Sequence, residues 1–474
     1  MKAELEAMES NQTWSIVPLP KDKNSIGCRW VYKIKHKVDG SIKRYKARLV
    51  AKGYTQQEGL DYFETFSLVA KMITVKTLLT IAVSKEWSLF QLDVNNAFLH
   101  GELFEEVYMD LPLGYKPQYE IHGEKLICKL HQSIYGLKQA SRQWFTKLST
   151  FLVSLGFQQL KVDYFLFIKG ENDSFIDLLV YVDDIIVGAN ALHIQELKRA
   201  LNQKFILKDL GPLKKFLGLE LARNSSGPFQ LSQRHYTLQL IEDTGLLGAK
   251  PTSVLMDPTT KLNASNKDIL YDATPYKCLI GRLLYLTISR PDITFAIHKQ
   301  SQFMAKPTIN HMNATNHLIK YLKGSPGKGI MLPKVQDFSI NAFADVDWGF
   351  CLNTRCSVTG FCVFLGNSLV SWKSKKQQTV ARSSTEAEYR ALAVTTCKVI
   401  WLHSLFNELQ IKALSSALLF CDNQATIYIV NNPMFHERTK HIKLDCHFVR
   451  DRIIDGSIKL LPIRSSNQLA DMFT

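Results

Sequence analysis

Two adjacent aspartates inside an apolar run constrain the fold of this chain more than any other feature. Tyr181-Val182-Asp183-Asp184 lies within the segment Ile176–Val187, whose remaining residues are mostly aliphatic. Carboxylates in such a run are costly unless a cation pairs with them. The flanks predict two buried strands joined by a tight turn, a place that aspartate tolerates. The pattern indicates either a hairpin tip that binds a hard cation such as Mg²⁺ or an ordinary turn with solvated acids.

A third carboxylate favours the metal interpretation. Asp93 lies near the end of Ser88–Val94, another strand-like segment. Three aspartates carried by strands can bridge two metal ions about 4 Å apart, and such a pair stabilises both the attacking and the leaving oxygens in phosphoryl transfer.

Six strings in order make the chain resemble the Pol polyprotein of copia-type LTR retrotransposons, particularly those of plants. They are Gly27–Lys33, Tyr45–Tyr54, Gln91–Val94 with Ala97–Gly101, Tyr135–Ala140, the Tyr-Val-Asp-Asp box, and Ser383–Tyr389. The resemblance covers almost the whole chain. It implies an α+β polymerase right hand of fingers, palm and thumb, followed by an α/β RNase H-like domain.

A chain of 474 residues is too long for a single core and predicts two or three domains. We expect reverse transcriptase fingers and palm over 1–235, a helical thumb or connection over 236–329, and a C-terminally truncated RNase H-like domain over 330–474. The breaker cluster Gly324–Gly327 marks the last boundary.

Hydrophobic periodicity predicts the main elements. Helices are expected over 72–84, 142–155, 193–204, 275–290, 292–304, 310–323 and 385–409, with a short one from 424 to 431. Strands are expected over 339–344, 359–365, 368–373 and 417–421, and a hairpin over 30–37 and 42–51 around Asp39-Gly40. Asp209-Leu210-Gly211-Pro212 predicts a turn, and a marginal helix begins at Asn467.

The net charge of +15 and the pI near 9.2 indicate a polyanionic partner. Basic residues are dense between Lys21 and Tyr54, where Trp30, Tyr32 and Tyr45 are interleaved with them. This favours a face for nucleic acid or nucleotide phosphates over a merely solvated basic hairpin.

Nine scattered cysteines without a CxxC pair indicate a reducing compartment. A zinc site at His436, His441, Cys446 and His447 is disfavoured because the spacing matches no usual finger. We expect no secretory signal and no membrane span. The resemblance implies a location that is cytoplasmic (in a virus-like particle) or nuclear.

A second acidic set lies in the last third of the chain. Asp345 and Asp422 each end a predicted strand, so they can converge on one metal site. The third acid of the set is expected on the helix over 385–409, where both Glu386 and Glu388 are candidates. Glu386 has capping-box spacing from Ser383, which gives it a structural role, and we choose Glu388. Asp347 lies two residues beyond Asp345, and we treat it as a secondary candidate for this acidic set.

The resemblance implies a role for each candidate of the polymerase half. Asp93, Asp183 and Asp184 would hold two Mg²⁺ ions, with Mn²⁺ as an alternative. Lys46 and Arg48 would clamp the triphosphate, and Phe98 would exclude a ribose 2′-hydroxyl, with core packing as its other interpretation. The remaining residues would be Tyr135 and Gly136 under the template–primer pair, Lys208 as a possible proton donor, and Phe216, Leu217 and Gly218 as the primer grip.

In the second half, the resemblance implies a two-metal site of Asp345, Glu388, Asp422 and Asp471 that cleaves the RNA of an RNA–DNA hybrid. Asp471 matches the family's fourth acid. The expected partners are an RNA template, a DNA primer, the hybrid and deoxynucleoside triphosphates.

The leading hypothesis is an RNA-directed DNA polymerase with an attached RNase H. The alternatives are a catalytically decayed nucleic-acid-binding remnant and a nuclease whose polymerase half is a scaffold. Leu68 and Ser141 stand where the family usually has proline, and losing a proline loosens a turn by up to about 1 kcal/mol. Neither change touches a carboxylate.

Overall fold

The computed structural model describes residues 1–36, 41–65, 71–117, 125–171, 174–189, 191–223, 228–257, 262–264, 267–411, 416–431 and 443–474. The chain forms two compact units. The first contains residues 1–70 and 88–212, and the second contains residues 71–87 and 213–474.

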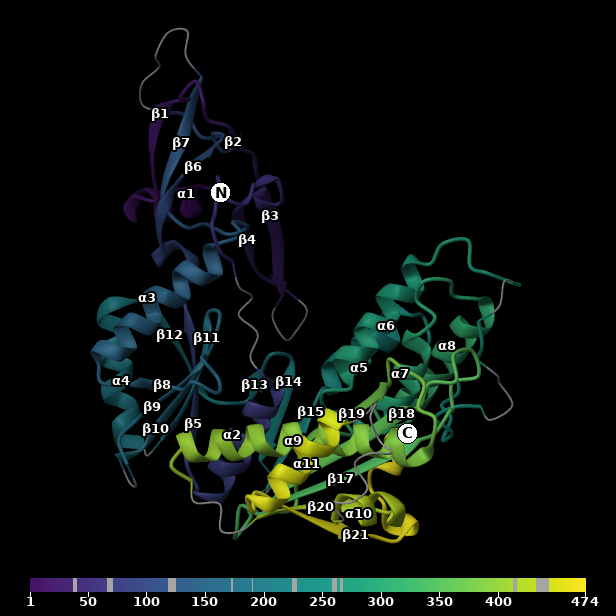
Figure 1. The fold of residues 1–474 in the computed structure, drawn as a ribbon. Helices are drawn as coiled ribbons and strands as arrows, with labels where there is room; N and C mark the ends of the chain where they lie inside the picture. The colour runs from purple at the N-terminus through teal and green to yellow at the C-terminus, as the bar shows by residue number, and fades with distance from the viewer. Residues whose placement is uncertain are drawn as a thin grey trace. The chain divides into compact units, whose positions relative to one another are not determined.

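A six-stranded sheet forms the centre of the first unit. Its strand order is β12 (Leu207–Pro212), β5 (Ser88–Val94), β11 (Asp184–Ala189), β10 (Ile176–Tyr181), β9 (Leu166–Lys169), β8 (Gln158–Gln159). The helices α3 (Ala140–Ser154) and α4 (Ala191–Lys204) bury their apolar faces against it. Figure 1 shows β5, β10 and β11 running side by side.

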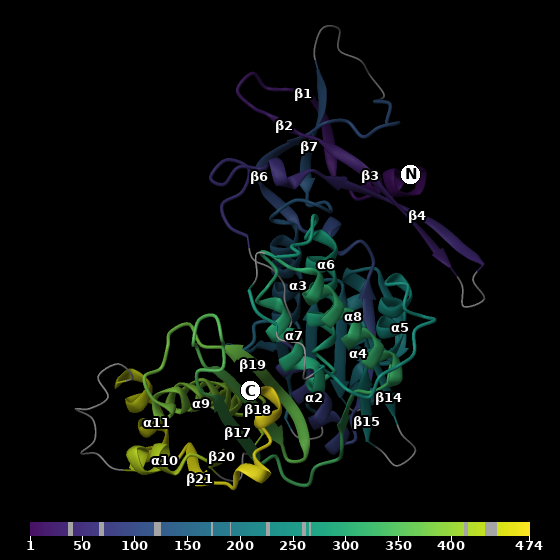
Figure 2. The same ribbon diagram turned by 90° about the vertical axis from the view of Figure 1, so that its right-hand side faces the viewer.

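Two smaller β structures complete the first unit. A four-stranded sheet has the order β1 (Trp14–Pro18), β7 (Leu126–Gln132), β6 (Glu102–Met109), β2 (Ser25–Ile26). β3 (Cys28–His36) and β4 (Ile42–Ala51) form a separate antiparallel pair, drawn out as a long hairpin in Figure 2. Met8 of α1 (Lys2–Ser10) and Leu49 of β4 belong to the same buried cluster as the four-stranded sheet. The 3-10 turns η1 (Gly53–Thr55) and η2 (Ala97–His100) follow β4 and β5.

The second unit begins with α2 (Met72–Ser84) and continues with a small sheet and a helical layer. The sheet has the order β13 (Lys215–Phe216), β14 (Leu219–Arg223), β15 (Phe229–Ser232), β16 (Ile330–Leu332). A shared apolar core joins α5 (Arg234–Asp243), α6 (Thr274–Leu286), α7 (Thr294–Ser301) and α8 (Ile309–Gly324), and η4 (Pro291–Ile293) precedes α7.

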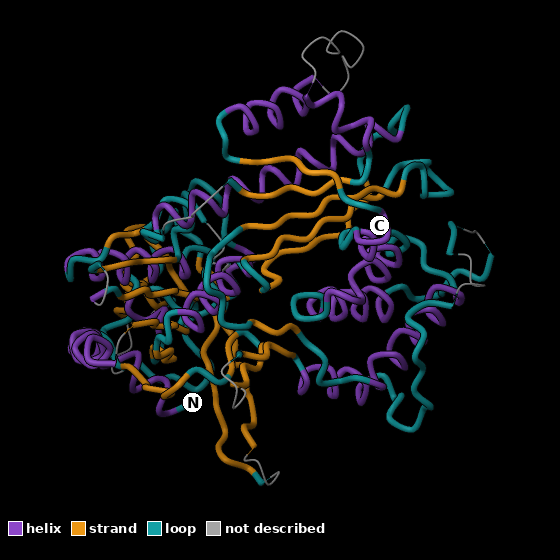
Figure 3. Tube along the Cα trace, turned by 90° about the horizontal axis from the view of Figure 1, so that it is seen from below, coloured by secondary structure: helices purple, strands orange, loops and turns teal. Residues whose placement is uncertain are grey.

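A five-stranded mixed sheet ends the second unit. Its order is β19 (Ser368–Lys376), β18 (Val358–Leu365), β17 (Ile340–Asp347), β20 (Ala417–Cys421), β21 (Ile458–Pro462). The first three strands are antiparallel neighbours, whereas β20 and β21 run parallel to β17. The helices are α9 (Ser384–Glu408), α10 (Gln424–Asn431) and α11 (Lys443–Ile454), followed by η7 (Ser465–Asn467) and η8 (Asp471–Phe473). Figure 3 shows these strands in orange beside the C-terminus, with helices next to them.

The predicted helices and strands agree with the structure to within a few residues. Two local predictions are wrong. Asp209–Pro212 is part of β12, because a bulge between Asp209 and Gly211 lets the strand continue its pairing with β5. The end of the chain forms two 3-10 turns instead of a helix from Asn467. The Asp39-Gly40 turn, Leu68, and the candidate zinc ligands His436 and His441 lie outside the described residues.

Candidate active sites

The tip of the β10–β11 hairpin has an unusual backbone. Tyr181 pairs with Asp184, so the loop consists of Val182 and Asp183 alone. Val182 has φ of +53°, which two-residue hairpins require at the first loop position but which a β-branched residue rarely adopts. The Nε1–H of Trp144 donates a hydrogen bond of 2.6 Å to the Val182 carbonyl, and Trp144 is fully buried. This tryptophan therefore holds the strained turn in place.

Strand pairing brings the third aspartate to the hairpin. In the β11–β5 register Asp184 lies directly opposite Asp93. The Val94 N–H donates to the Asp183 carbonyl at 2.8 Å. Directly opposite residues project from the same face with Cβ atoms about 4.5–5.5 Å apart. The structure thus gathers Asp93, Asp183 and Asp184 at one end of the sheet.

Burial makes this acidic end costly without a cation. The pKa of Asp93 is raised by burial and by the charge of Asp183, against the opposing charge of Lys208. Burial also raises the pKa of Asp184, although the Gln91 side chain donates to its Oδ1 at 3.0 Å. Repelling, half-buried carboxylates with free lone pairs suit a divalent ion that takes oxygen ligands.

Lys208 lies beside the acids because its strand, β12, pairs with β5. It pairs with Asp93 in the β12–β5 register. This position makes it a local cation for Asp93. The bulge after Asp209 leaves that pairing intact.

Tyr135 contacts two of the remaining candidates, Phe98 and Arg48, and Gly136 is its neighbour in the chain. The ring of Tyr135 meets that of Phe98 edge-on at 4.9 Å, and the Arg48 guanidinium lies 4.5 Å from the Tyr135 ring centre. The Ala51 N–H donates to the Tyr135 carbonyl at 2.8 Å. Gly136 has φ of +94°, and a Cβ there would stand 2.2 Å from the Ala51 carbonyl oxygen. Only glycine fits this close approach of the two backbones.

Lys46 lies on β4 near the acids. Burial, and then the charge of Arg48, lower the pKa of Lys46. The charge of Lys46 partly offsets the rise in the pKa of Asp93 that burial causes. A basic strand therefore faces the acidic end of the sheet within the first unit.

The primer-grip candidates belong to the second unit. Phe216 ends β13, and Leu217 and Gly218 follow with φ of +49° and +72°. The Tyr285 hydroxyl donates to the Leu217 carbonyl. This contact fixes the turn between β13 and β14.

The second acidic set converges in the second unit. Asp345 on β17, Glu388 on α9 and Asp422 after β20 each offer an oxygen within 4.8 Å of the other two, and in the described part of the chain no other three acid, histidine or cysteine side chains gather so closely. β17 and β20 are parallel neighbours, so their carboxyl ends meet. The Ser465 hydroxyl donates to Asp422 Oδ2 at 2.7 Å.

The electrostatics of this cluster also fit a metal ion. Glu388 is 5% exposed, and its Oε2 has no hydrogen-bond partner among the described residues. Burial, and then the charges of Asp345 and Asp422, raise the Glu388 pKa to about 9. Burial likewise raises the pKa of Asp345. Three carboxylates so close together, one of them buried and with an unpartnered oxygen, are the donor set that a hard divalent cation takes.

The other acids of this region have different positions. Glu386 accepts the Arg382 N–H at 2.7 Å and pairs with Arg390 at 2.6 Å, while its own N–H donates to Ser383. Its structural role is thereby explained. Asp471 lies in η8 outside the cluster of three. Burial is the main cause of the raised pKa values of Asp345 and Asp347, and the charge of Asp471 adds to both.

Sequence reasoning missed several residues that support these sites. Gln91 lies two residues before Asp93, on the same face of β5, and period-two alternation could have found it. Trp144 and Ser465 reach their carbonyl and carboxylate partners from distant segments, and no local signal marks them. Among the described residues, no helix is both long and apolar enough to cross a membrane.

Comparison with known proteins gives three findings. The model of the family described as reverse transcriptase (RNA-dependent DNA polymerase) matches residues 11–258. The Retrovirus-related Pol polyprotein from transposon RE2 of Arabidopsis thaliana is 43% identical over the whole chain, and that from transposon TNT 1-94 of Nicotiana tabacum is 37% identical. The chain spans about a third of these relatives, 32% and 36% of their lengths.

A solved structure of the foamy viral protease-reverse transcriptase in complex with ds DNA aligns with 98% of this chain and 70% of its own, with a TM-score of 0.49 and 10% identity.

Proposed function

Because the chain belongs to the reverse transcriptase (RNA-dependent DNA polymerase) family, we propose that it extends a DNA primer on an RNA template at the site of Asp93, Asp183 and Asp184. The match to plant retrotransposon Pol polyproteins confirms the copia-type resemblance. The observation that carries the proposed chemistry is the register of β11 on β5, which sets Asp184 opposite Asp93 beside the Asp183 turn.

The residues would act by position and charge. Asp93, Asp183 and Asp184 would hold the two divalent ions, preferably Mg²⁺, and bound ions would lower the pKa of the primer hydroxyl and neutralise the leaving pyrophosphate. Lys46 and Arg48 would bind the triphosphate oxygens, because β4 carries both beside the acids. Trp144 would keep the hairpin in register by holding the Val182 carbonyl.

Substrate selection would depend on the ring pair next to the acids. Phe98 is braced edge-on by Tyr135, whose other neighbour is the Arg48 guanidinium. A braced ring cannot swing away from a ribose 2′-hydroxyl, so it would favour deoxynucleotides. Gly136 would let the Tyr135 segment approach β4. Lys208 would be placed to hand a proton to the departing pyrophosphate, and Phe216–Gly218 would support the primer.

We also propose that Asp345, Glu388 and Asp422 form a second two-metal site in an RNase H-like domain that cleaves RNA in an RNA–DNA hybrid, with Asp471 at its edge. The support is the tight acidic cluster at the joined ends of β17 and β20. A hybrid is recognised by its shape and its 2′-hydroxyls. The three-part domain division, and a cytoplasmic or nuclear location, remain predictions.

Primer extension tests the first proposal. The full chain, a labelled DNA primer on an RNA template and deoxynucleoside triphosphates are incubated with Mg²⁺ or Mn²⁺. Asp183→Asn is expected to slow extension by about 100-fold or more, the scale for losing an electrostatic stabiliser, whereas the exposed Asp22→Asn control is expected to extend normally. No extension by the unaltered chain would leave the decayed nucleic-acid-binding remnant as the better assignment.

Hybrid cleavage tests the second proposal. Glu388→Gln is expected to abolish cleavage, and Glu386→Gln to retain it, because Glu386 is engaged by Arg382 and Arg390. Cleavage that is lost in Glu388→Gln while extension is absent throughout would instead support a nuclease with a polymerase-like scaffold.

A further inference from the structure

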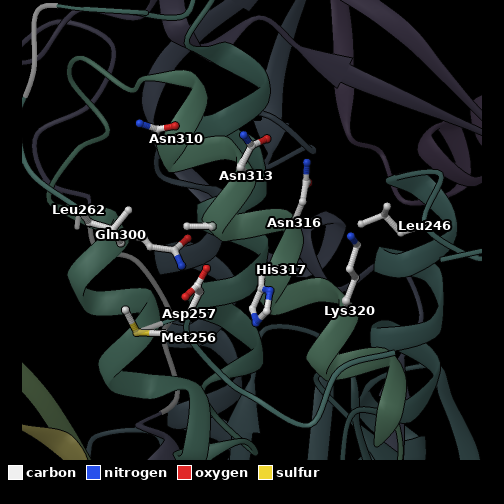
Figure 4. Close-up of a pocket in the computed structure, with 11 residues that line it drawn as sticks. Leu246, Met256, Asp257, Leu262, Gln300, Asn310, Asn313, Asn316, His317 and Lys320 are labelled. Carbon is white, nitrogen blue, oxygen red and sulfur yellow. The ribbon is translucent and has the colours of Figure 1, made fainter. Parts of the chain in front are cut away.

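A polar cavity lies in the helical layer of the second unit, and it shares no lining residue with either acidic site. It has a volume of about 420 Å³ and is formed by one face of α8, the end of α7 and the segment before α6. Its polar lining includes Asp257 and Gln300, the amides of Asn310, Asn313 and Asn316 on α8, and Lys320. Figure 4 shows the amides of α8 along one wall, Asp257 beside Gln300, and Lys320 on the other side of His317.

Gln300 is the residue that indicates a ligand. Its side chain is 1% exposed, and its Nε2 has no hydrogen-bond partner in the described part of the chain. The Thr315 hydroxyl donates to the other amide atom, Oε1, at 2.5 Å. A buried amide left half satisfied costs free energy that a polar ligand recovers. The cavity therefore contains an unused polar group at its inner wall.

The walls of the cavity are fixed by hydrogen bonds. The His317 ring Nε2 lies 2.9 Å from the Val254 carbonyl, and the Thr252 N–H donates to the Lys320 carbonyl at 3.3 Å. Lys323 Nζ donates to the Ala249 carbonyl at 2.6 Å. The segment 249–254 is thus tied along α8, so the cavity is preformed in the manner of small-molecule sites.

The lining has two chemically different ends. Gln300 and the α8 amides offer donors and acceptors of the kind that pair with base edges. At the other end stands the Lys320 ammonium, on the opposite side of His317 from Asp257 (Figure 4). Leu246, Met256 and Leu262 supply apolar surface for a flat ring.

We propose that this cavity binds a nucleotide, with its base against Gln300 and the α8 amides and its phosphate on Lys320. The volume lies within the range of pockets for ligands of this size. The nucleotide is either free in solution or one unit of a single strand, since both present the same base and phosphate. The inference is independent of the proposed polymerase and nuclease chemistry, because the cavity shares no residue with either acidic site.

Binding of adenosine 5′-monophosphate to the full chain tests the proposal. The titration is done calorimetrically with EDTA present, so that metal-dependent nucleotide binding elsewhere does not contribute. Lys320→Gln is expected to weaken binding by about tenfold, the effect of losing one charged hydrogen bond, and to leave adenosine binding unchanged. Asn313 is exposed, and Asn313→Leu is expected to weaken the binding of both adenosine 5′-monophosphate and adenosine. Lys306→Gln is the matched control, since Lys306 is exposed and lies outside the lining.

Location and source are measured separately. Photolabelling with 8-azidoadenosine 5′-monophosphate is expected to mark peptides containing 246–257 or 310–320. If an adenine-containing single strand competes with the monophosphate, the natural ligand is one nucleotide of a strand. If the strand does not compete, the natural ligand is a free nucleotide. The proposal is overturned if the monophosphate does not bind saturably, if Lys320→Gln and Lys306→Gln behave alike, if the label falls elsewhere, or if a zwitterionic amino acid such as glutamine binds instead.

Discussion

Replacing Glu388 by glutamine is expected to stabilise the second unit in the absence of divalent ions. The Glu388 carboxyl is 5% exposed, and its Oε2 has no partner among the described residues. Its pKa is raised from the ordinary 4.5 to about 9, first by burial and then by Asp345 and Asp422. The folded protein therefore keeps a proton that the unfolded chain releases at neutral pH.

The size of the effect follows from this difference in pKa. Below pH 4.5 the folded and the unfolded states both hold the proton, so the carboxyl does not lower the free energy of unfolding. As the pH rises from 4.5 towards 9, the unfolded state is favoured by about 1.4 kcal/mol per pH unit, or about 3 kcal/mol at pH 7. Glutamine has nearly the same shape and no proton to hold, so Glu388→Gln removes this penalty.

Hydrogen–deuterium exchange of the amides in α9 and β17 measures the effect locally in a chain of two units. In EDTA, we expect Glu388→Gln to be better protected than the unaltered chain at pH 8 and nearly equal to it at pH 5. Saturating Mg²⁺ is expected to remove the advantage, because a bound ion stabilises the ionised carboxylates and the glutamine variant binds it less well.

Glu386→Gln is the matched control on the same helix. Glu386 is already paired with Arg390 and the Arg382 N–H, so its substitution is not expected to stabilise α9 at any pH. Poorer protection of Glu388→Gln at pH 8 in EDTA, or an equal gain at pH 5 and pH 8, would show that the Glu388 carboxyl is not held in a desolvated, protonated state.

Three further predictions concern the first unit. Phe98→Ala, which removes the ring braced by Tyr135, is expected to raise the ratio of ribonucleotide to deoxynucleotide incorporation; an unchanged ratio would leave Phe98 as core packing. Trp144→Phe removes the donor to the Val182 carbonyl and is expected to cost about 1–3 kcal/mol in exchange protection of the hairpin, along with slower primer extension. Asp177 is 2% exposed, and burial raises its pKa to about 7. Its ionisation in the unfolded state therefore lowers the stability of the folded state as the pH rises from 3.8 to 7. Asp177→Asn is expected to increase the exchange protection of β10 at pH 8 and to have little effect at pH 3.5.

The positions of most elements were determined by the sequence alone. The apolar period placed a helix over 72–84, and the structure has α2 at those residues. The same reasoning located the strand that carries Asp93 and the pair of strands around Asp183. Local periodicity succeeds here because each of these elements buries one face or both, and the spacing of its apolar residues indicates which face is buried.

The composition of the sites was only partly visible in the sequence. The choice between Glu386 and Glu388 could be made because Ser383 is at capping distance from one of them. The place of Asp209–Pro212 could not be predicted, because the pairing of β12 with β5 outweighs the turn preference of Asp, Gly and Pro.

Only the tertiary structure decided which distant residues face each other. Asp93 and Asp184 are 91 positions apart, and a one-residue slip of β11 on β5 would send one of them to the opposite face of the sheet. The register is set by the packing of these strands with α3 and α4 and by the turn that Trp144 holds, and both depend on residues distant from the aspartates in the sequence. For the same reason the high pKa of Glu388 and the unused amide of Gln300 are properties of packing: desolvation depends on all the neighbours that fold around a group, and those neighbours come from every part of the unit.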